Sequence, residues 1–273
     1  MIMPIFNMVG GEGYKNAGLA WTDEGYLGIT PRNAVVYDDE IHILDYGGNT
    51  PVHSKWDGSS WTSVSTLPYK FAGGSAVVLN NEIHILGGTN STNHYKWDGS
   101  SWTSVSTLPY VLSNGSAVVF NNEIHILGGY NNSAKHYKWN GSTWTSVSTL
   151  PYDFWNGSAA VLNNEIHILG GSSGNRDHYK WNGMQWTSVS FLPYNFVQGA
   201  AVVCNYSYGD RIYLLGGTGN KTAHYELLEN KKWTNVSTLS HGLFYGSAVA
   251  YNNEINIFGE MYHSVFGEVY KKV

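Results

Sequence analysis

One pentapeptide recurs along the chain and constrains the fold more than any other feature. Glu-Ile-His-Ile-Leu occurs four times, two altered copies follow, and consecutive copies start 41 to 46 residues apart. The six copies start at Glu40, Glu82, Glu123, Glu165, Arg211 and Glu254. A period in the forties, filled by short alternating segments, is typical of β-propeller blades, whereas helical repeats would show a period of 3.6 within each unit. Six copies therefore predict six blades.

The second unit shows how four strands fit into one period. An apolar run meets the turn residues Asn80-Asn81, and a later polar-aromatic run meets Asp98-Gly99, a pair that favours a tight hairpin. Pro109 ends the last run, because proline cannot donate to a strand ladder. We name the four predicted strands A to D, at 75–79, 82–86, 94–97 and 102–108.

The two ends of the chain predict a closed ring. Trp21-Thr22 matches the Trp-Thr that opens strand D elsewhere, while the last unit ends at the equivalent of strand C. Residues near 20 should therefore complete the blade begun by 246–273, which removes free sheet edges. The predicted domains are a β-propeller over 19–273 and a leader or attachment arm over 1–18. Abundant Gly (32), Tyr (20) and Trp (11) agree with an all-β class.

The unit resembles the Kelch repeat, which is marked by a Gly-Gly pair, a Tyr and a Trp at near-fixed intervals. In the second unit these are Gly87-Gly88, Tyr95 and Trp102. They recur as Gly128-Gly129, Tyr137 and Trp144, as Gly170-Gly171, Tyr179 and Trp186, and as Gly216-Gly217, Tyr225 and Trp233. The resemblance implies an all-β, six-bladed propeller of four-stranded antiparallel blades. The arginine that usually precedes strand A in the family is absent from the second to sixth units.

Charge and hydropathy exclude several partners. The formal charge is −5 and the basic residues are scattered, so we expect no nucleic acid partner. No run approaches the roughly 20 apolar residues of a membrane span, and the first residues lack the basic region of a secretory signal. We expect no membrane insertion and a cytoplasmic or virion-associated protein. The single Cys204 lies in an apolar run and should be a buried hydrophobe. No cofactor is implied.

Histidines recur once per blade at two positions of the repeat. One set falls in strand B and the other in strand C, for example His84 and His94. Metal ligands must converge within about 2 Å of one ion, and residues repeated once per blade form wide rings. We predict structural histidines and no metal site.

Comparison of the copies separates uniform turns from diversified loops. The A–B turn is Asn-Asn in four units, whereas the four D–A loops before the second to fifth units differ in sequence. These loops read Lys70-Phe71-Ala72-Gly73, Val111-Leu112-Ser113-Asn114, Asp153-Phe154-Trp155-Asn156 and Asn195-Phe196-Val197-Gln198. The D–A and B–C loops share one end of a four-stranded meander. A scaffold that presents a binding surface has this arrangement, and neutral drift of surface loops is the alternative.

Aromatic and amide residues in these loops are the candidate ligand contacts. Ten of the eleven tryptophans fall in strand register, and only Trp155 has no place in the repeat. Phe154 shares its repeat position with Phe71 and Phe196, which also favours a structural role there. The candidate ligand-binding residues are Trp155, Phe154, Asn156, Asp153, Arg176, Asp177, Gln198, Phe244, Tyr245 and Tyr130. We interpret the chain as a non-enzymatic recognition module for a glycan or protein ligand, in analogy with bacterial or phage surface-recognition proteins.

Two other interpretations stay open. Asp45 and Glu260 replace glycine at the end of strand B in blades that ring closure makes neighbours, with Arg32 on the same face. Such a carboxylate pair could perform acid–base chemistry on a sugar, and some bacterial Kelch propellers are isomerases of the sialic-acid type. The third interpretation is a structural virion or assembly component that docks through residues 1–18.

Overall fold

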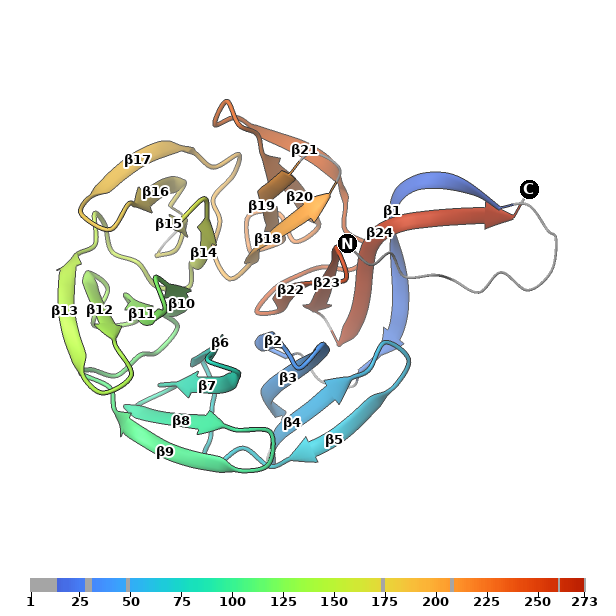
Figure 1. Cartoon of the computed structure of the whole chain (residues 1–273). Helices are drawn as coiled ribbons and strands as arrows, with labels where there is room; N and C mark the ends of the chain where they lie inside the picture. Colours follow the sequence, from blue (N-terminus) through green and yellow to red (C-terminus); the bar gives the residue numbers. More distant parts are fainter. Residues whose placement is uncertain are drawn as a thin grey trace.

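The computed structural model is a ring of six four-stranded antiparallel sheets around a central axis (Figure 1). It describes residues 14–27, 31–47, 50–172, 175–206, 209–259 and 261–272. Blade one consists of β2 (Asn33–Tyr37), β3 (Glu40–Gly47), β4 (Thr50–Trp56) and β5 (Trp61–Ser65). Blade two consists of β6 (Ser75–Leu79), β7 (Glu82–Leu86), β8 (Asn93–Trp97) and β9 (Trp102–Thr107). Blade three consists of β10 (Ser116–Phe120), β11 (Glu123–Leu127), β12 (Lys135–Trp139) and β13 (Trp144–Thr149).

The other three blades repeat the same meander from the axis outward. Blade four consists of β14 (Ser158–Leu162), β15 (Glu165–Leu169), β16 (Asp177–Trp181) and β17 (Trp186–Phe191). Blade five consists of β18 (Ala200–Tyr206), β19 (Gly209–Leu215), β20 (Ala223–Leu227) and β21 (Trp233–Thr238). Blade six consists of β22 (Ser247–Tyr251), β23 (Glu254–Gly259), β24 (Tyr262–Lys272) and the N-terminal β1 (Tyr14–Tyr26). The predicted all-β, six-bladed propeller is confirmed.

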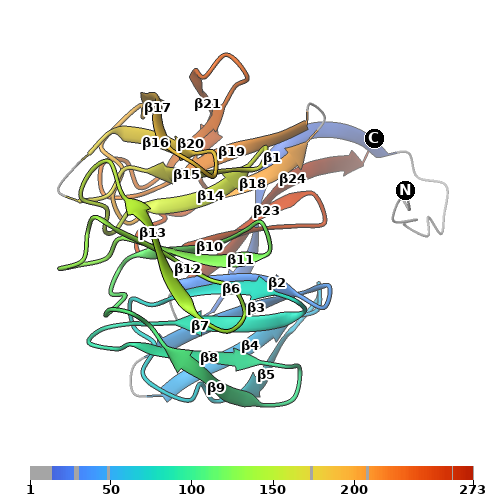
Figure 2. The same ribbon diagram turned by 60° about the vertical axis from the view of Figure 1, so that its left-hand side comes forward.

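The two ends of the chain close the ring. In blade six β1 pairs with β24, and Trp21 lies opposite Phe266. The two strands continue past the disc as a ribbon in which Tyr14 pairs with Lys272 (Figures 1 and 2). The strand begins at Tyr14, so residues 14–18 belong to the closing strand. The predicted attachment arm otherwise falls on residues 1–13, which lie outside the described residues.

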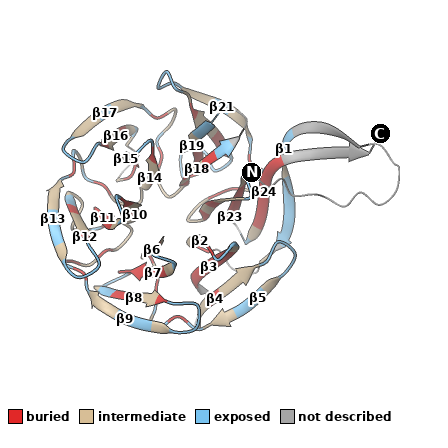
Figure 3. Ribbon diagram, viewed as in Figure 1, coloured by how far each residue is buried: buried red, intermediate tan, exposed pale blue. Residues whose placement is uncertain are grey.

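Apolar side chains between neighbouring blades form the core. Leu44 of blade one packs with Ile83, Ile85 and Trp97 of blade two, and all four are buried. The same alternation recurs around the ring, with the outer strands β9 and β13 half-buried or exposed (Figure 3). Each blade therefore completes the core of the next one, which is why a single repeat cannot fold alone.

The A–B and C–D turns lie on one side of the disc, which we call the turn face, and the D–A and B–C loops lie on the other, the loop face. Both residues of the A–B turn have positive φ, such as 52° at Asn80 and 59° at Asn81. At the C–D turn Asp57 accepts hydrogen bonds from the backbone N–H groups of Ser59 and Ser60, at 2.8 and 2.9 Å. Because the turn residues satisfy strict backbone demands, their uniformity has a structural cause.

Histidines from strands B and C meet in buried pairs within each of the first four blades. In blade two His94 Nε2 lies 2.9 Å from Nδ1 of His84, and His94 Nδ1 lies 3.0 Å from Oγ of Ser106. Trp144 of the next blade donates its Nε1–H to the same Oγ, at 3.1 Å. Ser106 Oγ therefore connects Trp144 to His94, and the His94 ring connects Ser106 to His84. This chain of hydrogen bonds, which we call the histidine relay, links one blade to the next.

Burial keeps the relay neutral. It lowers the pKa of His94 to about 3 and that of His84 to about 4. Equivalent histidine pairs occur at His42–His53, His125–His136 and His167–His178. The histidines thus have a structural role, as predicted, because each pair is buried and hydrogen-bonded. Within the described part of the chain, no group of three or more His, Cys, Asp or Glu residues is placed to hold a metal ion.

Cys204 is buried in β18, with an exposed fraction of 2%, in the core that blades five and six share. It has the predicted environment of a small hydrophobe. Over the residues that the structure describes, no helix has the length and apolar character to cross a membrane.

Candidate ligand-binding site

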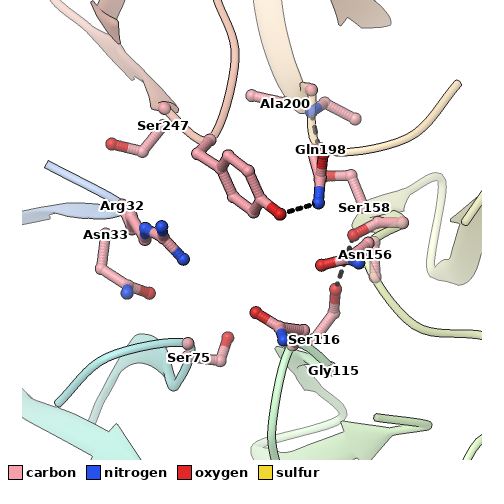
Figure 4. A pocket seen from close by; sticks show the side chains of 18 of the residues that line it. Arg32, Asn33, Ser75, Gly115, Ser116, Asn156, Ser158, Gln198, Ala200 and Ser247 are labelled. Atoms are coloured by element: carbon pink, nitrogen blue, oxygen red, sulfur yellow. Dashed lines mark hydrogen bonds between the residues drawn. The ribbon is translucent and has the colours of Figure 1, made fainter. Parts of the chain in front are cut away.

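The D–A loops converge at the axis on the loop face and surround a cavity of about 220 Å³. All six blades contribute to it, through the first residues of the inner strands and the residues just before them (Figure 4). We call this cavity the axial mouth. Its distinguishing side chains are Arg32, Asn33, Asn114, Asn156, Gln198 and Tyr245.

One backbone position holds five of the loops together. It lies two residues before the inner strand, and its φ is positive at Gly73 (70°), Asn114 (53°), Asn156 (57°), Gln198 (61°) and Tyr245 (56°). At each step the N–H of this residue donates to the C=O of its counterpart in the preceding blade. The N···O distances are 2.7, 2.7, 2.7 and 2.9 Å. The hydrogen bonds fix the loops relative to one another, so the mouth is preorganised.

Two residues at this position are unusual for the left-handed conformation. Glycine and asparagine adopt it readily, whereas Gln198 and Tyr245 do so at a cost of order 1–3 kcal/mol. Both side chains line the mouth, and Gln198 Nε2 donates to the Tyr245 hydroxyl (Figure 4). Strained backbone of this kind is concentrated at functional sites. The outliers therefore point to the mouth as the functional part of the loop face.

Blade one contributes the charge. Arg32 replaces a glycine that the other five blades keep before strand A; at Gly74 an added Cβ would lie 2.2 Å from the Phe71 ring. The Arg32 guanidinium lies over the Tyr245 ring, 4.2 Å from its centre. Pro31 has no N–H, so blade one cannot extend the ring of backbone hydrogen bonds; its C=O instead accepts from the Ser247 hydroxyl at 3.0 Å.

The structure brings three of the predicted contacts together in the mouth, namely Asn156, Gln198 and Tyr245. Arg32, predicted only for the enzymatic alternative, lies there too. Asn33 and Asn114 were missed. Asn114 has the same position relative to strand A as Gln198, and this is the signal that could have found it, whereas Asn33 opens strand A itself.

Trp155 and Tyr130 form an aromatic pair beside the mouth. Their rings meet edge to face with centres 5.6 Å apart, and Tyr130 is 55% exposed. Trp155 directly precedes Asn156, so the pair adjoins the mouth along the chain. Asp153 is exposed in the same loop and accepts a 2.6 Å hydrogen bond from the Ser133 hydroxyl.

The prediction of Phe154 as a ligand contact is wrong. Its side chain is 0% exposed and packs in the core between blades three and four. Phe71 and Phe196 are buried at the same repeat position. The loop must place one large apolar residue beneath itself to seal the inter-blade core, and that requirement takes Phe154 away from the surface.

The remaining candidates are dispersed over the loop side of blades four to six. Phe244 contacts Tyr245 edge to face at 4.6 Å, and Nζ of Lys221 lies 5.1 Å from the centre of the Phe244 ring. Arg176 is exposed and its Nε donates to the C=O of Leu192, at 2.6 Å. Asp177 begins β16 opposite Phe191 of the outer strand. Neither Arg176 nor Asp177 lines the axial mouth.

The described residues include one member of the proposed catalytic pair. Asp45 is buried near the end of β3, opposite Val52 of β4. Glu260 lies outside the described residues, so its position relative to Asp45 stays a prediction.

Comparison with known proteins supports the fold. No family model matches the chain, and no curated protein matches it. Among solved structures the chain is similar to YjhT, with a TM-score of 0.74 and 14% sequence identity over 90% of this chain and 95% of that one. A likeness at this identity carries the fold and not the function. The Kelch resemblance therefore stays a prediction, and the chain shares the β-propeller architecture of YjhT.

Proposed function

We propose that the chain is a non-enzymatic recognition module that binds a glycan on its loop face. The axial mouth holds one sugar residue, and the Trp155–Tyr130 pair contacts the next part of the ligand. The observation that carries this proposal is the series of hydrogen-bonded loops, which presents Asn114, Asn156, Gln198 and Tyr245 in one cavity. Strain at Gln198 and Tyr245 supports it, because such conformations persist where function requires them.

The chemistry of the mouth suits a small polyhydroxylated ligand. Amide groups and serine hydroxyls make directional hydrogen bonds, and the neighbouring aromatic rings can cover the C–H face of a sugar. The volume of about 220 Å³ lies below the usual range of drug-sized sites, which fits a single sugar ring. Because hydrogen bonds between blades fix the loops, little ordering entropy is lost on binding.

Binding is favoured over catalysis by the composition of the mouth. None of the described residues that line it is Asp, Glu or His. These are the most common general acids and bases, and of the other types that can serve, the described lining contains Tyr245. The sugar-active enzyme remains the second candidate and depends on Asp45 with Glu260. It requires turnover of a sugar that Asp45→Asn abolishes.

A glycan array tests the proposal with two variants of the site. Gln198→Gly removes the side chain while suiting the left-handed backbone, and Trp155→Ala removes the aromatic surface. Each should weaken a wild-type hit by at least about tenfold, because buried contacts of this kind contribute over 1 kcal/mol. Met184→Ser is the matched control: Met184 is 82% exposed in a C–D turn of the turn face, where three other repeats carry serine.

The outcomes separate the alternatives. A hit that the two site variants lose and the control retains supports a glycan-binding loop face. A hit that neither site variant changes refutes the proposed site. A wild-type chain that binds no glycan refutes the glycan ligand and leaves a protein partner as the alternative.

A further inference from the structure

We infer that the axial mouth binds the oxyanion group of its ligand, a carboxylate or a phosphate, through Arg32. This inference rests on the proposed function, because it names the chemistry of the ligand that the same site takes. Neither the likeness to YjhT nor the recognition role requires it. Its basis is the balance of charges and hydrogen-bond donors in the mouth.

The charge in the mouth comes from Arg32. Within the described part of the chain it is the one Lys, Arg, Asp or Glu residue that lines the cavity. No described carboxylate forms an ion pair with it, and its guanidinium contacts the neutral Tyr245 ring. Figure 4 shows the guanidinium pointing into the space between the loops. By contrast, five lysine or arginine side chains on the strands each form an ion pair with a glutamate, as Lys55 does with Glu40 at 2.8 Å.

Serine hydroxyls add donors around this charge. Ser75 Oγ accepts the N–H of Ala117 at 2.9 Å, and Ser158 Oγ accepts the N–H of Ala201 at 2.9 Å. A hydroxyl that accepts a backbone N–H still carries one hydrogen to donate. Ser75 and Ser158 thus face the mouth with a hydrogen available, on blades two and four.

The mouth therefore contains a positive charge and hydrogen-bond donors, and no described carboxylate lines it. A preorganised cavity of this composition favours an anion. Guanidinium groups bind carboxylate and phosphate oxygens through two parallel hydrogen bonds, which are stronger than neutral ones. Arg32 is exposed, so water and salt screen its charge. We therefore expect millimolar affinity for a simple ion and tighter binding when the rest of the ligand adds contacts.

Nuclear magnetic resonance titration of the full chain tests this inference. The probes are inorganic phosphate, acetate and the neutral sugar glucose, each added at constant ionic strength. The backbone amides of Gly115, Asn156 and Gly157 report on the mouth. At least one anion should shift these signals saturably, with a dissociation constant at least tenfold lower than that of glucose. The phosphate and acetate arms show which oxyanion is preferred.

Two variants show whether Arg32 is responsible. Arg32→Gln keeps a polar side chain and should raise the dissociation constant of the preferred anion at least tenfold, with the fold intact. Met184→Ser should leave it unchanged. The inference is overturned if neither anion shifts the mouth amides, or if Arg32→Gln binds the anion as the wild type does.

The outcomes also distinguish this inference from the proposed function. If glucose or an array glycan shifts the mouth signals and neither anion does, the inference fails while the glycan-binding module stands. If no probe shifts the mouth signals and the array is silent, both fail.

Discussion

Lowering the pH from 7.5 to 5 should destabilise the propeller by at least about 10 kcal/mol, because the histidine relay must stay neutral. Five strand C histidines are fully buried, and burial lowers the pKa of each to about 3: His53, His94, His136, His178 and His224. In the unfolded chain their pKa is about 6.5. At pH 5 the unfolded chain takes up nearly one proton per histidine, and the folded chain takes up almost none.

The sign follows from the lowered folded-state pKa. The contribution is fully present above pH 6.5 and is lost as the pH falls toward 3. At pH 5 each histidine is 1.5 pH units below its unfolded pKa, which costs about 2 kcal/mol, or about 10 kcal/mol for these five. The strand B histidines, such as His84 with a pKa of about 4, add to this loss. Domains are stable by about 5–15 kcal/mol in total, so the chain should unfold between about pH 6 and 4.5.

Urea unfolding followed by tryptophan fluorescence at several pH values measures this loss, since the relay ends on tryptophan indoles. A change below about 3 kcal/mol between pH 7.5 and 5 would refute the reasoning. His84→Asn is a matched variant, because blade six already pairs Asn256 Oδ1 with His263 Nε2 at 2.8 Å. Its pH slope near pH 5 should fall by about 1.4 kcal/mol per pH unit, the effect of one proton.

Two further predictions each compare a substitution at a closely packed position with one at a less packed position. Phe154→Ala should lower the free energy of unfolding by about 3–5 kcal/mol, because it opens a cavity in the core. Trp155→Ala should lower it by about 1 kcal/mol. Equal losses for the two variants in urea unfolding would contradict this assignment. Gly128→Ala should cost well over 2 kcal/mol, since its Cβ would lie 1.9 Å from the Phe154 carbonyl oxygen, while Gly141→Ala, with open space around it, should cost about 1 kcal/mol in thermal unfolding.

The repeat made the fold predictable from the sequence. Predicted strands A and B of the second unit, 75–79 and 82–86, coincide with β6 and β7. Six copies of one pattern average out local ambiguity, and turn residues such as Asn80-Asn81 mark where each hairpin reverses. The ring closure followed from a single Trp-Thr match, because a propeller has only one place for an unpaired strand.

The site was only partly predictable, because three-dimensional packing decides which way a loop residue points. Phe154 and Trp155 are adjacent, yet the first seals the core and the second is half-exposed. The axial mouth joins six loops that are some forty residues apart, and small side chains such as Asn114 gave no signal of their own. The histidine pairs also escaped prediction: His84 lies opposite Lys96 and His94 opposite Leu86, so the two rings meet diagonally.

Closure of the ring determines when, during synthesis, the axial mouth can form. Arg32 comes from blade one and Tyr245 adjoins blade six, and β1, the outer strand of blade six, precedes the other five blades along the chain. During synthesis β1 therefore stays unpaired until its partner strand β24 has been made. The axial mouth is complete only when blades one and six meet, so a chain that ends before blade six has five blades and lacks the Tyr245 side of the site.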